Sequence, residues 1–538
     1  MDTSVGIHSA DVETVAAHLV QCDAINRIWQ GDYSLWKPDP TEISNRLGWL
    51  AVTELMRERV PMLERFANEV RDAGFRYIVL LGMGGSSLGA EVLRQTFGSS
   101  KGYPELIVLD STLPACVQAV TDTIDPRHTL FIASSKSGTT VETVSLLQYF
   151  LSLTQSAMGK ESARKNFAVI TDDDTPLARL AKDEDFLHAF VNPSDIGGRY
   201  SVLSYFGLVP AALIGVDIAT LLDRANRMRK RCASSADIHE NSGAWPGTIM
   251  GALSLRKRDK LTIITSPAIG SFGLWVEQLV AESTGKEGKG IVPIINEPFV
   301  EPDCYGGDRL FVYLRLQSDR NSSTDRMIER LKSLEQPVIV LELEDVYDLG
   351  AEFFRWEFAT AIAGAVLGIN PFTQPNVSSA KQATRRMLDE FITSGRIPRL
   401  EISHSFTDLL AGVKSSTYLA IMAYIPQTPE ADKILENLRR RLSERYHIAT
   451  TLGYGPRYLH STGQLHKGGP ATGLYLQITM LHKKDLPIPE RPYTFGVLVD
   501  AQAIGDLEAL HSLGRPVTKF HLDQGNVAAI SQLIEELV

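Results

Sequence analysis

The stretch YIVLLGMGGSSLG, residues 77–89, decides the fold of the first part of the chain. A short, continuously apolar run leads into a turn rich in glycine and serine, and the turn opens a helix that we expect to continue to Phe97. Similar apolar runs follow over residues 106–109, 129–133 and 167–170. Buried strands that alternate with helices predict a parallel sheet covered on both faces, which is a doubly wound α/β domain.

The remaining sequence predicts further units of this kind, since 538 residues are too many for one hydrophobic core. The segments RLFVYLRL (309–316) and YTFGVLVD (493–500) are aligned as strands, and each is followed by a helical stretch and then by the pattern LxxLxxPV. Two interpretations of this likeness stay open: a degenerate internal repeat, or α/β units that resemble each other by pattern alone. The predicted division is a helical segment over 1–40, a first α/β domain over 41–235, a second over 236–395 and a C-terminal α/β domain over 396–538.

The composition excludes several classes of protein. The net charge of −10 disfavours a nucleic-acid partner, because nucleic-acid binders usually concentrate positive charge. The four cysteines include no C-x-x-C pair, so we expect neither a zinc site nor a disulfide framework. The chain begins without the features of a signal peptide, and its longest apolar stretch is too short to span a bilayer. We therefore expect a cytoplasmic protein with no membrane partner.

Two turns in the first predicted domain have the composition of an anion-binding site. The first covers residues 82–89, and the second is SSKSGTT, residues 134–140. Glycines let the backbone approach an anion, N–H groups at a helix start point toward it, and hydroxyls and a lysine add donors. Neither turn is a nucleotide P-loop, and the first is not a clean dinucleotide fingerprint. Both turns should lie at the carboxyl ends of strands in one sheet, where such sheets bind ligands.

Together the two turns resemble the phosphate-binding elements of a sugar isomerase (SIS) domain, and more narrowly those of the phosphoglucose isomerase family. The resemblance implies SIS-type parallel sheets, with two SIS domains ahead of the C-terminal domain. The family often has an aromatic residue where Gly138 stands. By this resemblance, a sugar 6-phosphate would be held by Ser86, Ser135, Ser137 and Thr140. The resemblance also implies that Gly85, Lys136 and Thr139 bind the substrate.

Two more segments resemble motifs around the reacting carbons in that family. QLVAESTGK, residues 278–286, is similar to Q-x-x-x-E-S-x-G-K. It implies that Glu282 moves a proton between C1 and C2 and that Gln278 contacts the sugar or its phosphate. GGRYS, residues 197–201, is similar to the family's Gly-Gly-Arg-x-Ser loop and implies that Arg199 stabilises an enediolate and that Gly198 binds the substrate. Any of these residues alone would be an ordinary helix end or surface loop; their joint occurrence favours the functional interpretation.

The groups that would open the sugar ring come from two later segments. NPFTQPNVSSAK, residues 370–381, resembles a bacterial isomerase segment and implies Lys381 at the ring oxygen, with Thr373 where Asp is usual. The family's ring-opening histidine usually falls before that lysine, and this chain has none there. YLHSTGQLHKGG, residues 458–469, is similar to the family's D-L-H-S-x-G-Q segment, but it follows the lysine, as in the isomerase half of transaldolase/phosphoglucose isomerase fusions. We expect His460 to open the ring, with His466 as the competitor.

The resemblance implies reversible isomerisation of glucose 6-phosphate and fructose 6-phosphate through a cis-enediolate, by a homodimer that needs no metal or redox cofactor. In the family the histidine comes from a neighbouring subunit; here it could also reach the site within its own chain. One alternative is a bifunctional phosphoglucose/phosphomannose isomerase. Another is a non-catalytic sugar-phosphate sensor, which would have no need for Glu282, Arg199 and Lys381 together.

Overall fold

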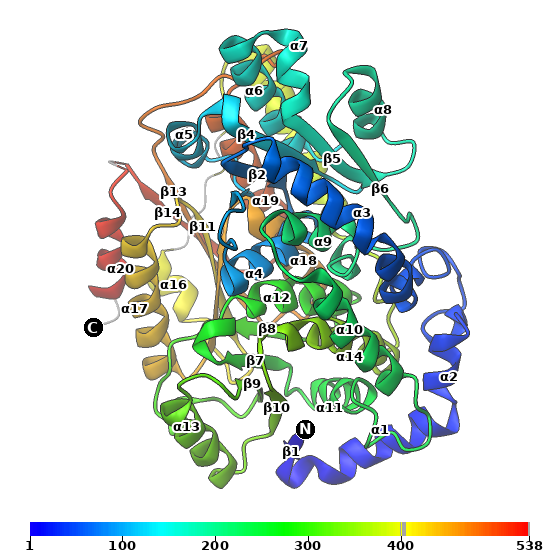
Figure 1. Ribbon diagram of the computed structural model, residues 1–538. Helices are drawn as coiled ribbons and strands as arrows, with labels where there is room; N and C mark the ends of the chain where they lie inside the picture. Colours follow the sequence, from blue (N-terminus) through cyan, green and yellow to red (C-terminus); the bar gives the residue numbers. More distant parts are fainter. Residues whose placement is uncertain (399, 401–404, 524, 536–538) are drawn as a thin grey trace.

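The computed structural model describes residues 1–398, 400, 405–523 and 525–535, and three mostly parallel sheets organise it (Figure 1). The first sheet confirms the predicted doubly wound unit, with all its neighbouring strands parallel. The prediction missed β6, because this edge strand buries only part of its HAFVN sequence and has no continuous apolar run. The strand order is β3 (Glu105–Leu109), β2 (Tyr77–Gly82), β4 (Thr129–Ser134), β5 (Phe167–Asp172) and β6 (His188–Asn192).

The second sheet contains four parallel strands, in agreement with the predicted second α/β domain, and one further strand that was not expected. Residues 1–40 were predicted to be helical, and α1 (Ser9–Gln21) and α2 (Ala24–Trp29) agree. The first residues instead form β1 (Asp2–Ser4), which pairs antiparallel with the edge of the sheet and is too short to show a sequence pattern. The order is β1, β10 (Val338–Leu343), β9 (Arg309–Leu316), β7 (Lys260–Thr265) and β8 (Val292–Ile295).

The third sheet corrects the alignment proposed for the last part of the chain. Residues 493–500 are not a strand; they open the helix α19 (Phe495–Ser512), and the Thr494 side chain caps that helix by accepting a hydrogen bond from the backbone of Val497. A short apolar run fits a buried helix as well as a strand, which is why the pattern misled. The sheet order is β12 (Ala449–Tyr454), β11 (Tyr418–Tyr424), β13 (Gly473–Met480) and β14 (Val517–Leu522).

In the third sheet, β13 has the position that β9 has in the second sheet. The part of the proposed alignment that matches the two LxxLxxPV segments is confirmed. Both LxxLxxPV segments end in the last strand of their sheets, at Val338 of β10 and Val517 of β14. Apart from the antiparallel edge strand β1, the second and third sheets share one order of their four parallel strands. In each, the second strand lies outside the first, and the third and fourth follow on the other side. The first sheet has this order with a fifth strand added, so all three units follow one doubly wound pattern.

Packing joins the three units. One hydrophobic core contains residues of the first sheet, of the second sheet and of the helix α14 (Leu349–Leu367). The third sheet is attached through Arg439 of α17 (Pro429–Tyr446), which is 3% exposed. Its guanidinium donates to the carbonyls of Ile295 at 2.9 Å and Asn296 at 2.7 Å, at the end of β8. Among the described residues, every helix is too short or too polar to cross a membrane.

The register of the strands places the two glycine- and hydroxyl-rich turns side by side. Gly82, the last residue of β2, pairs with Ser134, the last residue of β4. The first turn leads into α4 (Leu88–Phe97) and the second into α6 (Val141–Met158). Near the centre of Figure 1, α4 packs against α12 (Phe272–Thr284), and α12 packs against α18 (Gly463–Gly468), so all three units contribute to one region.

Candidate active site

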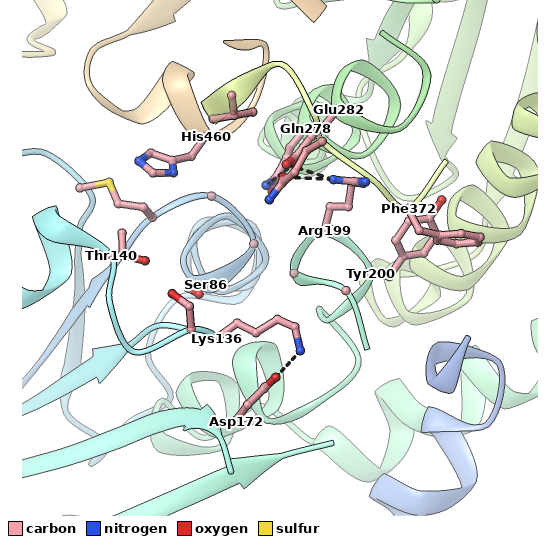
Figure 2. A pocket seen from close by; sticks show the side chains of 18 of the residues that line it. Ser86, Lys136, Thr140, Asp172, Arg199, Tyr200, Gln278, Glu282, Phe372 and His460 are labelled. Carbon is pink, nitrogen blue, oxygen red and sulfur yellow. Dashed lines mark hydrogen bonds and ion pairs between the residues drawn. The ribbon is translucent and has the colours of Figure 1, made fainter. Parts of the chain in front are cut away.

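A cavity of about 490 Å³ lies beside the carboxyl ends of β2 and β4 (Figure 2). The four side chains expected to be catalytic all line it: Glu282, Arg199, Lys381 and His460. They come from α12, from the short turn Gly198–Tyr200, from α15 (Val377–Ser394) and from the turn Arg457–His460. The expected binding residues that also line it are Gly85, Ser86, Lys136, Ser137, Thr140, Gly198 and Gln278.

Ser135 and Thr139 were expected to bind the substrate but lie outside the cavity lining. The Ser135 hydroxyl lies 2.9 Å from that of Thr140, and the Thr139 hydroxyl donates to Ser137 at 3.0 Å. They therefore orient the hydroxyls of Thr140 and Ser137, which line the cavity together with that of Ser86. A further bond, from the Ser134 hydroxyl to the carbonyl of Ser86 at 2.8 Å, joins the two turns.

Lys136 reaches the cavity but is already paired. Its ammonium forms an ion pair with Asp172, visible in Figure 2, and donates to the carbonyl of Ser194 at 2.9 Å. The anion cradle therefore depends mainly on hydroxyls and on N–H groups at the start of α4 and α6. Two of the three N–H groups of Lys136 are used in these contacts, so this lysine is held at the edge of the cradle by groups of the protein.

Gly84 shows how closely the parts of the site approach each other. Its φ is +54°, a left-handed conformation that favours glycine. A Cβ atom there would lie 2.7 Å from the carbonyl oxygen of His460 and 2.8 Å from Nε2 of Gln278. The phosphate turn, the histidine turn and the base helix therefore touch at a position that admits no side chain.

Glu282 is buried and held at both carboxylate oxygens. Oε1 lies 3.0 Å from Nη1 of Arg199, and Oε2 accepts a hydrogen bond from Nε2 of Gln278 at 3.0 Å. Gln278 and Glu282 are one helical turn apart, as their i, i+4 spacing predicts. The carboxylate is thus oriented beside the cation expected to stabilise an enediolate.

Arg199 also connects this pair to the segment that carries Lys381. Its Nη2 donates to the carbonyls of Pro371 at 3.0 Å and Thr373 at 2.9 Å. Lys286, the last residue of the 278–286 motif, had no role assigned to it; it donates to the carbonyl of Asn370 at 2.8 Å and also contacts Thr373. Burial and the nearby Arg199 charge lower the pKa of Lys286 well below its ordinary value.

His460 enters the cavity from the same chain that supplies Glu282. Its Nε2 lies 2.8 Å from Oε1 of Glu142, which is 3% exposed on α6, and Nε2 of Gln502 donates to the same oxygen at 2.6 Å. Burial would raise the pKa of Glu142, but His460 and Gln502 bring it below its ordinary value. Because Glu142 occupies Nε2, Nδ1 is the ring nitrogen left for a ligand.

The competitor His466 has a structural role. It is 3% exposed, lies outside the cavity lining, and packs its ring 5.1 Å from that of Tyr475. Burial, with the charge of Lys467, lowers the pKa of His466 to about 3. The structure therefore favours His460 as the ring-opening residue.

Sequence reasoning missed several residues of the site. Glu142 stands two positions after the second turn, where an acid in the first turn of a helix is usual, so only its partner reveals its role. Gln502 comes from α19, two residues after the segment 493–500 that was aligned with a strand, and belongs to no motif. Glu42, Arg46 and Asp172 belong to none of the motifs and are recognised only because they line the cavity. Tyr200, Phe372 and Gln374 also line it; they lie inside the quoted motifs, but no role was assigned to them.

Comparisons with known proteins agree with this geometry. The Phosphoglucose isomerase family model matches residues 31–288. The glucose-6-phosphate isomerase of Staphylococcus saprophyticus is 30% identical over 383 residues, which cover 63% of this chain and 86% of that protein. A hypothetical protein from Thermus thermophilus superposes with a TM-score of 0.59 at 25% identity, covering 72% of this chain and 99% of the other. A glucose-6-phosphate isomerase from Chlamydia trachomatis, 18% identical over 70% of this chain and 86% of its own, shares the fold with a TM-score of 0.59.

Proposed function

The chain belongs to the phosphoglucose isomerase family, and on this premise we propose that its cavity interconverts glucose 6-phosphate and fructose 6-phosphate through a cis-enediolate. The observation that carries the proposal is the convergence of Glu282 with the hydroxyl-lined anion cradle on one cavity. The volume of about 490 Å³ lies within the ordinary range for small-molecule sites.

The phosphate binds first, in the proposed sequence of events. The hydroxyls of Ser86, Ser137 and Thr140 face the cavity, and Thr140 is the residue that precedes α6. Hydroxyl donors and helix-start N–H groups suit a phosphate dianion without requiring a free lysine. Binding at this end directs the sugar carbons toward His460 and Glu282.

His460 and Lys381 then open the ring. Nδ1 of His460 accepts the proton of the O1 hydroxyl, the C1–O5 bond breaks, and O5 takes a proton from the ammonium of Lys381. Glu142 stabilises the imidazolium that forms, because its carboxylate lies 2.8 Å from Nε2. When the ketose ring closes, the same transfers run in reverse and both residues regain their starting charge.

Glu282 carries out the isomerisation of the open chain. It removes the proton from C2, the C1=C2 bond forms and O1 becomes negative. The O2 proton then moves to O1, and protonated Glu282 delivers its proton to C1 as the C2 carbonyl forms. Arg199, 3.0 Å from Glu282, stabilises the negative oxygens as their charge develops.

The other interpretations are not favoured. A sensor needs no base, yet Glu282, Arg199 and Lys381 all line the cavity. The relative from Staphylococcus saprophyticus carries the name glucose-6-phosphate isomerase, which favours that reaction over a combined phosphomannose activity. Because His460 reaches the cavity of its own chain, one chain supplies every group of the proposed mechanism. The homodimer and the cytoplasmic location stay predictions.

Replacing Glu282 with Gln tests the proposal, with Glu277→Gln as the matched control. Glu277 is buried on the same helix but lies outside the cavity lining, and burial raises its pKa to about 7. We expect Glu282→Gln to lower kcat by about 10²–10⁴-fold, the usual contribution of a positioned base, while Glu277→Gln keeps it within a few-fold. Binding of 6-phosphogluconate, an open-chain hexonate phosphate, should persist in both. Unchanged turnover in Glu282→Gln would refute the assigned base.

A further inference from the structure

Gln464 lies where the segments that carry His460, Glu282 and Lys381 meet. We propose that its side-chain amide is a positioning residue that holds these segments in the geometry the reaction needs. The inference rests on the proposed function and adds to it a residue that does not face the substrate, since Gln464 lies outside the cavity lining.

The amide uses all its polar atoms to join the three segments. Nε2 donates to the carbonyl of Gly285 at 2.8 Å and to Oδ1 of Asn376 at 2.8 Å. Oε1 accepts a hydrogen bond from the backbone N–H of Asn376 at 2.9 Å. Gly285 ends the base helix α12, and Asn376 precedes the lysine helix α15. A side-chain amide offers two donor hydrogens and one oxygen, and all are used here.

Close backbone packing surrounds this junction. Gln464 is 1% exposed. A Cβ atom on Gly468 would lie 2.4 Å from Oδ1 of Asn376 and 2.6 Å from Nε2 of Gln464. A Cβ atom on Gly285 would lie 2.5 Å from Cα of Leu465. The junction therefore has no space to shift, and loss of the amide would leave buried polar groups unpaired.

Short stretches of chain connect the junction to the reacting groups. Gly285 is three residues from Glu282, Asn376 is five from Lys381, and Gln464 itself is four from His460. A displacement at the junction is therefore transmitted to all three groups. The phosphate cradle lies on other elements, the turns after β2 and β4, and makes no use of Gln464. Loss of the amide should thus lower kcat while substrate affinity is kept.

The test compares Gln464→Ala with Gln477→Ala. Gln477 lies in β13 of the same unit, is also 1% exposed, and donates to the carbonyl of Ala503 at 2.8 Å. Both variants remove a buried amide and should lose similar melting temperature. We expect Gln464→Ala to lower kcat about 10- to 100-fold with KM within about 3-fold, because a misplacement of 1 Å can cost that much. Gln477→Ala should keep kcat.

Asn376→Ala is a second variant, which keeps the inference testable if Gln464→Ala does not fold. Asn376→Ala removes the Oδ1 acceptor but keeps the backbone N–H that binds Gln464, so it should show a smaller loss in kcat. In the double variant, the losses should be less than additive if the two side chains act as one unit. Equal kcat values for Gln464→Ala and Gln477→Ala, or fully additive losses, would overturn the inference. A wild-type enzyme without isomerase activity would instead overturn the proposed function.

Discussion

Nε2 of His460 lies 2.8 Å from Oε1 of Glu142, although 318 positions separate the two residues in the sequence. The histidine belongs to the third unit and the glutamate to the helix that follows the second phosphate turn. This contact assigns the ring tautomer, since a carboxylate that accepts from Nε2–H leaves Nδ1 free to take a proton. It also explains how a displaced histidine motif can serve the same chemistry.

Replacing Glu142 with Gln should impair ring opening. The amide keeps the size of the side chain but removes the charge that stabilises the imidazolium, so we expect kcat on cyclic glucose 6-phosphate to fall by about 10²–10⁴-fold. Steady-state kinetics with the Glu277→Gln control measure the effect. Retention of full activity would show that the pair is only structural.

Replacing Gln502 with Leu should move the acid limb of the pH profile. Burial raises the pKa of Glu142, and the hydrogen bond from Gln502 is one of the contacts that lower it. Without that bond the pKa of Glu142 rises, so its carboxylate becomes protonated at a higher pH when the solution is acidified. A hydrogen bond to a charged group corresponds to about one pH unit. A profile of kcat/KM against pH, with Gln477→Leu as control, should show this upward shift; a downward shift would contradict it.

Replacing Thr373 with Asp should stabilise the protein at neutral pH. Lys286 is 1% exposed with a lowered pKa, and its Nζ lies 3.3 Å from the Thr373 hydroxyl, where the resembling segment has a carboxylate. A lysine whose pKa is lowered on folding costs stability below that pKa, and the cost fades as the pH rises toward 10.5. The new carboxylate should add about 1 kcal/mol at pH 7 and less in alkali. Denaturant titrations of Thr373→Asp and Thr373→Asn, at pH 7 and again in alkali, would measure the difference in stability. Equal stability of the two variants would contradict the ion pair.

Mixing two inactive variants should not restore activity. Because His460 and Glu282 line one cavity of a single chain, Glu282→Gln and His460→Asn chains have no intact site between them. The measurement is the specific activity after the two variants are unfolded, mixed and refolded together. Recovery of activity would mean that the histidine crosses between subunits, and wild-type enzyme refolded alone controls for yield.

Much of the fold was predictable because strands such as β2 and β4 are continuously apolar and end in glycine-rich turns. The edge strands β1 and β6 were not predicted, because β1 is short and β6 is half exposed. The residues named by motif, Glu282 and Arg199 among them, were found because their spacing is local. Glu142 and Gln502 were not, because a partner from a distant element gives each its role, and sequence spacing does not encode that contact.

The buried attachment of the third unit has a consequence for any attempt to divide this protein. Val292 and Ile294 of β8 share a hydrophobic cluster with Tyr418 and Ala449 from the third sheet. A fragment that stopped at residue 395 would expose the apolar side chains of β8 to solvent. It would also leave the carbonyls of Ile295 and Asn296 without the hydrogen bonds from Arg439. Uncovered edges of this kind recruit other chains, so the truncated fragment should precipitate rather than persist as a smaller enzyme.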